Sequence, residues 1–508
     1  MLAGWHVTNG AMARRYVGVG EGPPDRPVSG RRADTEADKG MVYDGAPVPH
    51  TERTKSSDHR AFVALGSNVG NRLGMIERAC LEMNTEAGVR VVRTSGLYET
   101  TPMYYEDQDP FLNGACEIET SLAPTELLDV LQDIERRLGR EKLVEKGPRC
   151  IDLDILLYDD KRVSSNRLTV PHASLLEREF VLRPLCEVVP SFQSQGSVSE
   201  HLDLVSTRSP VMSTAVEVCP VQPPIRAMDP KRCTRVMSIL NVTPDSFSDG
   251  GKNLTSDQAV LGATIKEHIA AGATIIDIGG QSSRPHAPSI SPGEELSRIL
   301  PAIRAIKSLP EAENVAISID TYRAAVAAAA FDAGAHIIND ISAGTLDPDM
   351  LPTMAELGCT VCLMHMRGTP DTMTSKENCT YPNGLIPTIA HELLDRVRAA
   401  ERAGIRRWRI ILDPGIGFAK TQEQNLEILR RFAELRDWPG LRGIPWLLGS
   451  SRKGFIGRIT GVVEARERSW GTAATVAAAV VGGADIVRVH DIAEMAKVAK
   501  MADAIWRV

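Results

Sequence analysis

Eight short apolar runs, each ending in polar side chains, recur along the second half of the chain, and the segments between them have the length of helices. This alternation predicts a (β/α)8 barrel. The chemistry of that fold lies at the C-terminal ends of its strands and in the loops that follow them, so we expect the functional residues there. The runs are 239–251, 275–284, 315–321, 336–340, 361–367, 410–418, 447–453 and 485–491.

A different pattern covers residues 61–195, where few strands and few helices follow one another. It predicts an α+β, ferredoxin-like layered domain with helices packed on a mainly antiparallel sheet. The strands are expected at 62–65, 89–98, 113–119 and 151–158, and the helices at 71–86 and 124–138.

Two other segments lack any amphipathic period. Residues 1–58 are rich in Gly, Pro, Arg and Asp, which predicts a disordered leader. Residues 196–231 carry Ser-rich and Pro-rich patches, which predict a linker. We therefore expect domains at 59–195 and 232–508.

Composition then excludes several classes of function. The net charge of −7 comes from 58 basic and 65 acidic residues without long runs, so we expect neither nucleic acid nor membrane as a partner. The nine cysteines are irregularly spaced, which predicts free thiols in a reducing compartment. Cys359 and Cys362 lie within an apolar run, so we interpret this single Cys-x-x-Cys as packing and not as a zinc site.

Candidate chemistry in the first domain centres on residues 147–158. Alternate side chains of a strand share a face, so Asp152 and Asp154 should project together. Two adjacent carboxylates repel each other unless a cation lies between them, and Mg2+ bound to nucleotide phosphates fits this arrangement. Arg140 and Arg149 could hold phosphate oxygens, and His172 could do the same or transfer a proton. The alternative is a solvated acidic edge strand.

This set of motifs resembles 6-hydroxymethyl-7,8-dihydropterin pyrophosphokinase over about residues 60–190. The motifs are Leu65-Gly-Ser-Asn68, Gly139-Arg140, Gly147-Pro-Arg149, Asp152-Leu-Asp154 and 167–172. The resemblance implies transfer of pyrophosphate from ATP, the co-substrate, to the pterin hydroxymethyl group, with two Mg2+ ions on Asp152 and Asp154. It also implies that Glu135, Arg140 and His172 lie near ATP, that Arg149 contacts the moving phosphates, and that Asn113 and Phe180 hold the pterin.

The ends of the predicted barrel strands carry a second set of polar residues. Inward-facing carboxylates and amides are costly in a dry barrel mouth unless a ligand supplies N–H donors, and a flat heterocycle rich in such donors would satisfy them. Arg488 and His490 share a face near the usual phosphate site of this fold, and Asn241 could hold a metal ion on the same anion. The set is Asn241, Ser283, Arg284, Asp320, Asn339, Asp413, Lys453, Arg488 and His490.

These residues lie in motifs that resemble dihydropteroate synthase from about residue 236 to the C-terminus. The motifs are 240–251, 279–285, 318–321, 338–340, 363–368, 412–418, 450–453 and 487–490. The resemblance implies that the pterin lies between Asp320, Asn339, Asp413 and Lys453, with Met364 and Phe418 near its ring. Diphosphate would lie by Asn241, Arg284, Arg488 and His490 with one Mg2+, and 4-aminobenzoate by Ser283, Pro285 and Ser451.

Four positions depart from these two families. In the first module, Lys146 replaces an aromatic residue and Phe111 replaces a tyrosine. We expect these two changes to alter the affinity for substrates more than the type of reaction. Ser283 replaces a threonine, and His286 stands where a glycine often follows Arg-Pro. His286 adds bulk beside the aminobenzoate pocket, so we expect weaker inhibition by sulfonamides than in a His286→Gly variant.

The preferred hypothesis is a bifunctional enzyme whose first module makes the diphosphate that the second consumes. The alternatives are a pterin-dependent methyltransferase barrel, which has no use for Lys453 or a kinase module, and a catalytically silent pterin-binding protein. The resemblance implies a homodimer or a higher homo-oligomer through the barrel helices. Arg14 and Arg15 without nearby acids resemble the start of a mitochondrial presequence, so cytoplasm and mitochondrial matrix both stay open.

Overall fold

The computed structural model describes residues 59–103, 106–141, 147–189, 213–214, 225–243, 258–282 and 287–508. The expected leader and most of the expected linker lie outside these ranges. No helix in the described part of the chain is long and apolar enough to cross a membrane. The eight cysteines among the described residues are free. Cys362 is buried within a strand and Cys359 is buried just before it, as packing residues should be.

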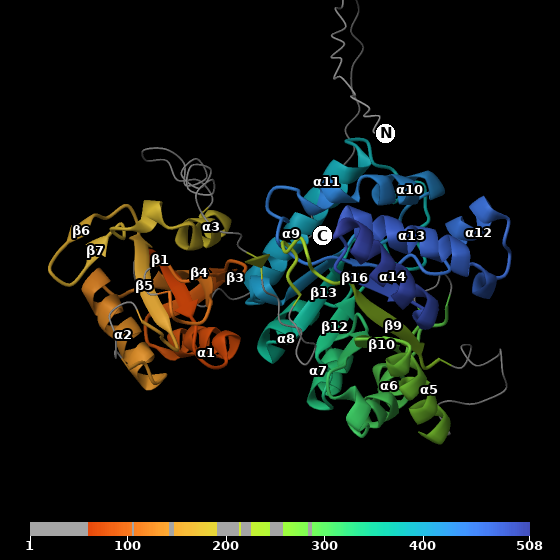
Figure 1. Cartoon of the computed structure of the whole chain (residues 1–508), viewed down its shortest axis with the longest axis horizontal. Helices are drawn as coiled ribbons and strands as arrows, with labels where there is room; N and C mark the ends of the chain where they lie inside the picture. The colour runs from red at the N-terminus through yellow and green to blue at the C-terminus, as the bar shows by residue number, and fades with distance from the viewer. Residues whose placement is uncertain are drawn as a thin grey trace, which may run out of the picture. The chain divides into compact units, whose positions relative to one another are not determined.

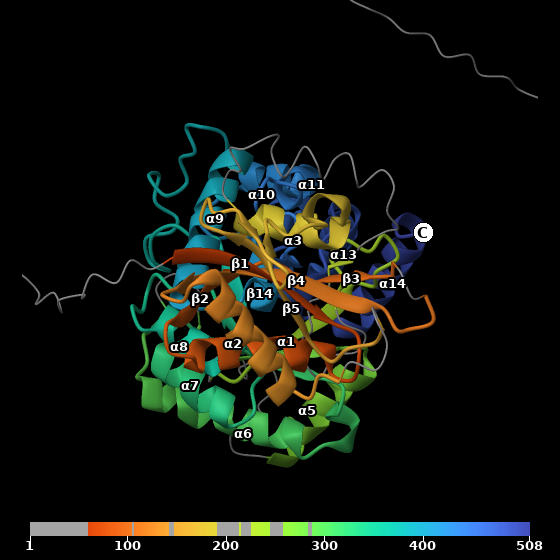
Figure 2. The same ribbon diagram turned by 90° about the vertical axis from the view of Figure 1, so that its left-hand side faces the viewer.

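The N-terminal part is a sheet with helices on both faces (Figures 1 and 2). All of its strand pairs are antiparallel, in the order β5-β1-β4-β3-β8, and β2 also pairs with β4. The predicted α+β layer is therefore confirmed. Its elements are β1 (His59–Ser67), α1 (Arg72–Thr85), β2 (Val89–Thr94), β3 (Tyr98–Thr100), β4 (Phe111–Thr120), α2 (Pro124–Arg137), β5 (Asp152–Tyr158), β6 (Val163–Ser164), β7 (Thr169–Val170), η1 (Leu175–Glu177), α3 (Glu179–Val188) and β8 (Ser213–Thr214).

Alternation along the strands explains the two covered faces. Val63 and Leu65 of β1 pack in the core that includes α1 and α2, while Phe62 packs with residues of α3. The strand expected at 89–98 is in fact two strands, because the Ser95 hydroxyl accepts the amide hydrogen of Ala115 at 2.9 Å and interrupts the ladder. Helix α3 and the short strand β8 were not predicted.

The C-terminal part is a ring of parallel strands surrounded by helices (Figure 1). The strand order is β14-β13-β12-β11-β10-β9-β16-β15, and a bridge between Leu412 and Trp446 closes the ring, so the barrel prediction is confirmed. The strands are β9 (Arg235–Asn241), β10 (Ile275–Gly279), β11 (Ala316–Asp320), β12 (Ile337–Asp340), β13 (Thr360–Met364), β14 (Ile410–Asp413), β15 (Leu447–Leu448) and β16 (Ile486–Val489). The helices are α5 (Gln258–Ala270), α6 (Pro292–Lys307), η3 (Pro310–Ala312), α7 (Ala324–Asp332), α8 (Met350–Leu357), α9 (Leu385–Ala403), η4 (Arg407–Arg409), α10 (Gln422–Arg430), α11 (Phe432–Arg436), α12 (Gly454–Thr460), η5 (Ala465–Glu467), α13 (Ser469–Gly482) and α14 (Ile492–Trp506).

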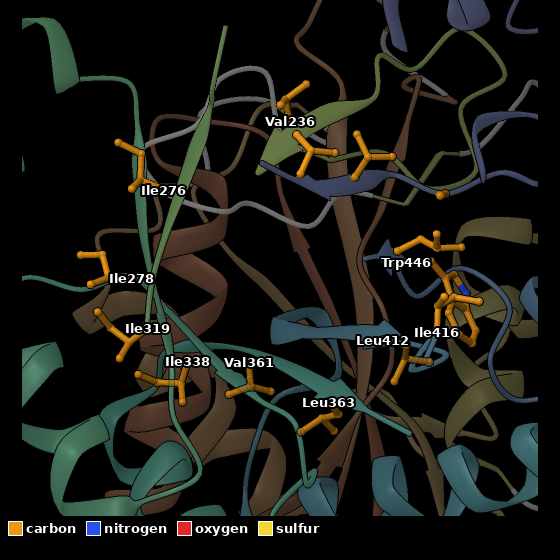
Figure 3. Close-up of a cluster of buried hydrophobic side chains, with 14 of the residues drawn as sticks. Val236, Ile276, Ile278, Ile319, Ile338, Val361, Leu363, Leu412, Ile416 and Trp446 are labelled. Atoms are coloured by element: carbon orange, nitrogen blue, oxygen red, sulfur yellow. The ribbon is translucent and has the colours of Figure 1, made fainter. Parts of the chain in front are cut away.

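Side-chain alternation along the barrel strands separates two apolar groups. One set packs in the main barrel core together with residues of the helices, as Figure 3 shows for ten labelled residues from Val236 to Trp446. The other set closes the interior at the N-terminal end of the strands: Met237, Ile275, Ala316, Ile337, Cys362, Ile411, Leu447 and Ile486. Ile225, from the expected linker, joins this inner plug. Side chains two positions later in a strand lie on the same inward face but nearer the open end of the barrel. In five strands that residue is polar: Asp277, Ser318, Asn339, Asp413 and Arg488.

Ser56–Val508 forms one compact unit. Within it, the turn η4 contributes Trp408 to the core under the N-terminal sheet, where the indole is 1% exposed and its Nε1 donates to Glu77 at 2.6 Å. The backbone N–H of Arg407 donates to the Thr94 hydroxyl at 3.0 Å. This turn therefore connects the barrel to α1 and β2.

Candidate active sites

Strand β5 places the two predicted carboxylates on one face. Ile151, Leu153 and Ile155 are buried in the apolar core, whereas Asp152 and Asp154 both line a cavity of about 290 Å³. The alternation expected from the sequence is therefore present. The cavity also brings together Asn113, Arg140, Arg149, His172 and Phe180.

Two arginines meet the first of these carboxylates. Arg140 Nη2 lies 2.8 Å from one oxygen of Asp152, and Arg149 Nη1 lies 2.6 Å from the other. Arg140 also pairs with Glu135, whose side chain accepts the Leu153 amide hydrogen at 2.7 Å. Burial raises the pKa of Glu135 to about 7. Glu135 does not line the cavity, so its described contacts hold Arg140 and strand β5 in place.

The other end of this cavity is more apolar. Asn113 is buried and its side-chain amide donates to the Thr100 hydroxyl at 2.8 Å. Phe111 and Phe180 line the same space, and each lies under a guanidinium, that of Arg149 at 5.5 Å and that of Arg178 at 5.8 Å from the ring centroid. A flat ring with polar edges would fit between such groups.

The carboxylate pair fits a divalent cation. Burial and then the charge of Asp152 raise the pKa of Asp154 to about 6, so a cation between the two would relieve a real repulsion. Among the described residues, no group of three or more His, Cys, Asp or Glu side chains could hold a metal ion. Mg2+ needs no such group, because it commonly takes one or two protein carboxylates and completes its shell with phosphate oxygens and water.

A larger cavity, of about 970 Å³, opens at the C-terminal end of the barrel strands. It brings together ten of the residues singled out in the sequence: Asn241, Asp320, Asn339, Met364, Asp413, Phe418, Ser451, Lys453, Arg488 and His490. Ser283, Arg284, Pro285 and His286 lie outside the described residues, as does Lys146 of the first module.

Arg488 is held by two carboxylates in this cavity. Its Nε donates to Asp277 at 2.6 Å and its Nη2 to Asp320 at 2.7 Å. The Asn339 side-chain amide also donates to Asp277, at 3.2 Å. Asp277 was not predicted, although it lies two residues before Gly279 in β10 and therefore on the same inward face. The sequence signal that could have identified it is an acidic residue at an inward-facing position of an otherwise apolar strand.

Asp413 and Lys453 share the other side of the cavity. The Asp413 carboxylate accepts the Gly415 amide hydrogen at 2.7 Å, and burial raises its pKa to about 6. Burial lowers the pKa of Lys453 to about 8, and its Nζ lies 4.2 Å from the centre of the Phe418 ring. A hydrogen-bond acceptor, a hydrogen-bond donor and an aromatic ring therefore line one region of the cavity.

His490 contributes little positive charge. Its Nδ1 lies 3.0 Å from the Ser451 hydroxyl, and burial lowers its pKa to about 3. The ring is therefore neutral near pH 7. The fixed positive charge expected from His490 on a departing anion is accordingly small, and this residue can act as a neutral donor or acceptor.

A second buried network, also missed in the sequence, lies behind Asp413. The Lys420 ammonium is 3.0 Å from His365 Nδ1 and donates to the Phe418 carbonyl at 2.9 Å, while His365 Nε2 is 2.8 Å from Glu392 of α9. The Glu392 carboxylate can only accept, so His365 Nε2 carries the hydrogen and its Nδ1 accepts from Lys420. This network fixes the loop after β14 to the loop after β13.

Comparison with known proteins matches both parts of the chain to families. Residues 62–190 match the family described as 7,8-dihydro-6-hydroxymethylpterin-pyrophosphokinase, and residues 237–490 match the family described as pterin binding enzyme. The chain is 43% identical over 485 residues to the "Folate synthesis bifunctional protein, mitochondrial" of Arabidopsis thaliana, covering 92% of this chain and 86% of that one.

Two further matches extend this picture. The "Folic acid synthesis protein fol1" of Pneumocystis carinii is 46% identical over 460 residues, which cover 89% of this chain but 60% of that protein, so this chain spans about three-fifths of its length. A crystal structure of a triple mutant of Plasmodium falciparum HPPK-DHPS with pteroate has the same fold, with a TM-score of 0.74 at 22% identity over 89% of this chain and 96% of that one. The chain therefore belongs to the family of folate synthesis bifunctional proteins, which join a hydroxymethyldihydropterin pyrophosphokinase to a pterin binding enzyme.

Proposed function

We propose that this chain catalyses two consecutive steps of folate synthesis. The first transfers pyrophosphate from ATP to 6-hydroxymethyl-7,8-dihydropterin, and the second joins the product to 4-aminobenzoate, giving 7,8-dihydropteroate and diphosphate. The observation that carries the proposal is the presence in one chain of two cavities, one around the β5 carboxylate pair and one in the barrel mouth, each within a matching family segment. A pterin-dependent methyltransferase is disfavoured because it has no use for the first module.

In the first step, the chain's own residues bind and orient two substrates. Asn113 and Phe180 would hold the pterin, and Arg140 and Arg149 would move from Asp152 toward the phosphates when ATP arrives. Two Mg2+ ions bound at Asp152 and Asp154 would neutralise phosphate charge. His172 would complete the ATP side of the site, and Glu135 would lie behind it and hold Arg140 toward ATP.

In the second step, the barrel mouth binds the pterin through Asp320, Asn339, Asp413 and Lys453, with Met364 and Phe418 against its ring. Arg488, His490, Asn241 and the loop that carries Arg284 would hold the diphosphate, and one Mg2+ ion would offset its charge. Ser283, Pro285 and Ser451 would hold 4-aminobenzoate. Its amine forms a C–N bond at the pterin methylene carbon, while the C–O bond to diphosphate breaks and the amine loses a proton.

The decisive experiment supplies the purified chain with ATP, Mg2+, hydroxymethyldihydropterin and 4-aminobenzoate. AMP and dihydropteroate should both accumulate, and AMP without dihydropteroate would remove the second half of the proposal. An Asp152→Ala variant should form no AMP yet make dihydropteroate from synthetic pterin diphosphate. Lys453→Met is the converse variant, in which AMP forms and dihydropteroate does not. Loss of both products in either variant would contradict two separate sites.

We further propose domain boundaries at 59–195 and 232–508 and a homodimer through the outer barrel helices. Apolar side chains are exposed on α13 and α14, with Trp470 at 89%, Met501 at 62% and Val481 at 51%. Exposed apolar groups on neighbouring helices are a common dimer surface. Light scattering should give twice the chain mass, and Trp470→Glu should give the mass of one chain.

The cellular compartment is proposed as the cytoplasm or the mitochondrial matrix. The Arabidopsis thaliana and Pisum sativum relatives are named mitochondrial proteins. A fluorescent protein fused to the C-terminus of the chain, with and without residues 1–58, distinguishes the two compartments, because only a presequence would direct the longer fusion to mitochondria.

A further inference from the structure

Asp277 is a fully buried carboxylate that accepts hydrogen bonds from side chains of three other strands. It is 0% exposed in the middle of β10. One oxygen accepts from the Ser318 hydroxyl at 2.6 Å, and the other accepts from Asn339 at 3.2 Å and from Arg488 at 2.6 Å. A buried charge is tolerated only when its partners match it, so these bonds explain why an acid persists in this core.

Asp277 lies one layer below the residues that a substrate could reach. It is paired in register with Ser318 of β11, whereas Gly279, the next inward residue, is paired with Asp320. Asp320, Asn339 and Arg488 line the barrel cavity, and Asp277 does not. Its influence on a ligand must therefore pass through Arg488 and Asn339.

The two carboxylates bound to Arg488 set the orientation of its guanidinium and offset its positive charge. Nε is bound to Asp277 and Nη2 to Asp320, so the plane of the group is set by carboxylates on two strands. Two carboxylates against one guanidinium also leave little net positive charge there. A free arginine would instead hold a multiply charged anion strongly.

We propose that Asp277 is a positioning residue of the barrel site, which aligns Arg488 and Asn339 for the pterin and keeps Arg488 from retaining the diphosphate product. The proposal rests on the synthase activity proposed above. Asp277 would thus influence both the binding of the pterin and the release of diphosphate, although it contacts neither ligand.

The test compares Asp277→Asn with the unchanged chain. Two ligands are used: pteroate, whose dissociation constant is measured by calorimetry, and inorganic diphosphate with Mg2+, whose inhibition constant is measured in the synthase assay. Loss of the charge should weaken pteroate binding and strengthen diphosphate inhibition, each by about tenfold, the ratio that accompanies one partly screened charge interaction. A merely structural role would weaken both ligands together, and that result would overturn the proposal.

An Arg488→Gln background shows whether Asp277 acts through Arg488. Adding Asp277→Asn to that variant should leave the diphosphate inhibition constant unchanged. The variant has no guanidinium at position 488 that the loss of Asp277 could free to bind diphosphate. A further strengthening of inhibition in the double variant would contradict the inference.

Arg488→Lys decides the case if Asp277→Asn does not fold. A lysine keeps the charge but cannot bind Asp277 and Asp320 with two fixed donors. Pteroate should then bind more weakly while diphosphate inhibits at least as strongly, and equal weakening of the two would overturn the proposal. If the unchanged chain makes no dihydropteroate from synthetic pterin diphosphate, the proposed function fails, whatever the variants show.

Discussion

At the scale of single residues, the ionisation of the barrel site predicts a narrow pH window for dihydropteroate formation. Burial raises the pKa of Asp413 to about 6 and that of Asp320 to about 7, so these carboxyls lose their charge as the pH falls through that range. Burial lowers the pKa of Lys453 to about 8, so its ammonium is lost as the pH rises above that value. We expect kcat/KM for synthetic pterin diphosphate to be highest between these limits.

Lys453→Arg provides the control for the alkaline limb. A guanidinium stays charged throughout the range, so the variant should keep the acid limb and lose the alkaline one, whatever its absolute rate. An alkaline limb that is identical in both proteins would show that another group causes it.

A second prediction at this scale concerns Gly415, which precedes the ring of Phe418 in the loop after β14. Its φ is +69°, and a Cβ atom there would lie 2.1 Å from the His365 carbonyl oxygen. Gly415→Ala should therefore lower the free energy of unfolding by roughly 2–5 kcal/mol, from left-handed strain and overpacking together, and should weaken pteroate binding.

Gly358 is the matched control, because its φ is +60° and nothing lies within 4 Å of the added Cβ atom. Gly358→Ala should cost about 1 kcal/mol and leave pteroate binding unchanged. Urea denaturation and calorimetry of both variants check the pair. Equal costs would mean that the loop moves freely at Gly415.

At the scale of elements, the sequence predicted the barrel strands well because each is a short apolar run with a polar end. It also predicted that Asp152 and Asp154 share a face, because the alternation of side chains along a strand depends only on neighbouring residues. It missed Asp277, Lys420 and Glu392, because their roles depend on partners from distant elements: Arg488 for Asp277, and the His365 ring for the other two. Ser95 split a predicted strand through a bond to Ala115, which local periodicity does not contain.

The buried Lys420, which joins the loops after β13 and β14, predicts a pH dependence of stability. Burial lowers its pKa from 10.5 to about 7. Between these values the unfolded chain binds a proton that the folded chain does not, so this group makes the folded state more stable as the pH rises from about 7 to 10.5. In Lys420→Met that contribution is absent.

Urea denaturation at pH 7, 8 and 9 measures this effect as the difference in unfolding free energy between the two proteins. The difference should shift in favour of the unchanged chain as the pH rises. Lys266→Met, at a side chain 52% exposed, is the control and should give a constant difference. A constant difference for Lys420→Met as well would show that its ammonium is not desolvated.

At the scale of the whole molecule, the turn η4 makes the stability of the described unit depend on one indole. Trp408 is among its largest fully buried side chains, and Arg407 beside it is buried between Glu401 of α9 at 2.8 Å and Glu187 of α3 at 3.3 Å. Separate chemistry in the two sites is therefore compatible with shared folding. A substitution at a catalytic carboxylate should abolish one activity, whereas a substitution at this turn should lower the stability on which both activities depend.

Trp408→Ala should lower the free energy of unfolding by roughly 3–5 kcal/mol, because it empties a large buried volume and leaves Glu77 without its indole donor. Leu81→Ala on the exposed side of α1, at a residue 59% exposed, should change it by less than about 0.5 kcal/mol. On heating, AMP formation and dihydropteroate formation should fall at the same lowered temperature in Trp408→Ala, since Trp408 belongs to the barrel part and packs in the core of the N-terminal part. If only AMP formation became heat-sensitive, the barrel would fold without the support of the N-terminal sheet, and η4 would serve the first module alone.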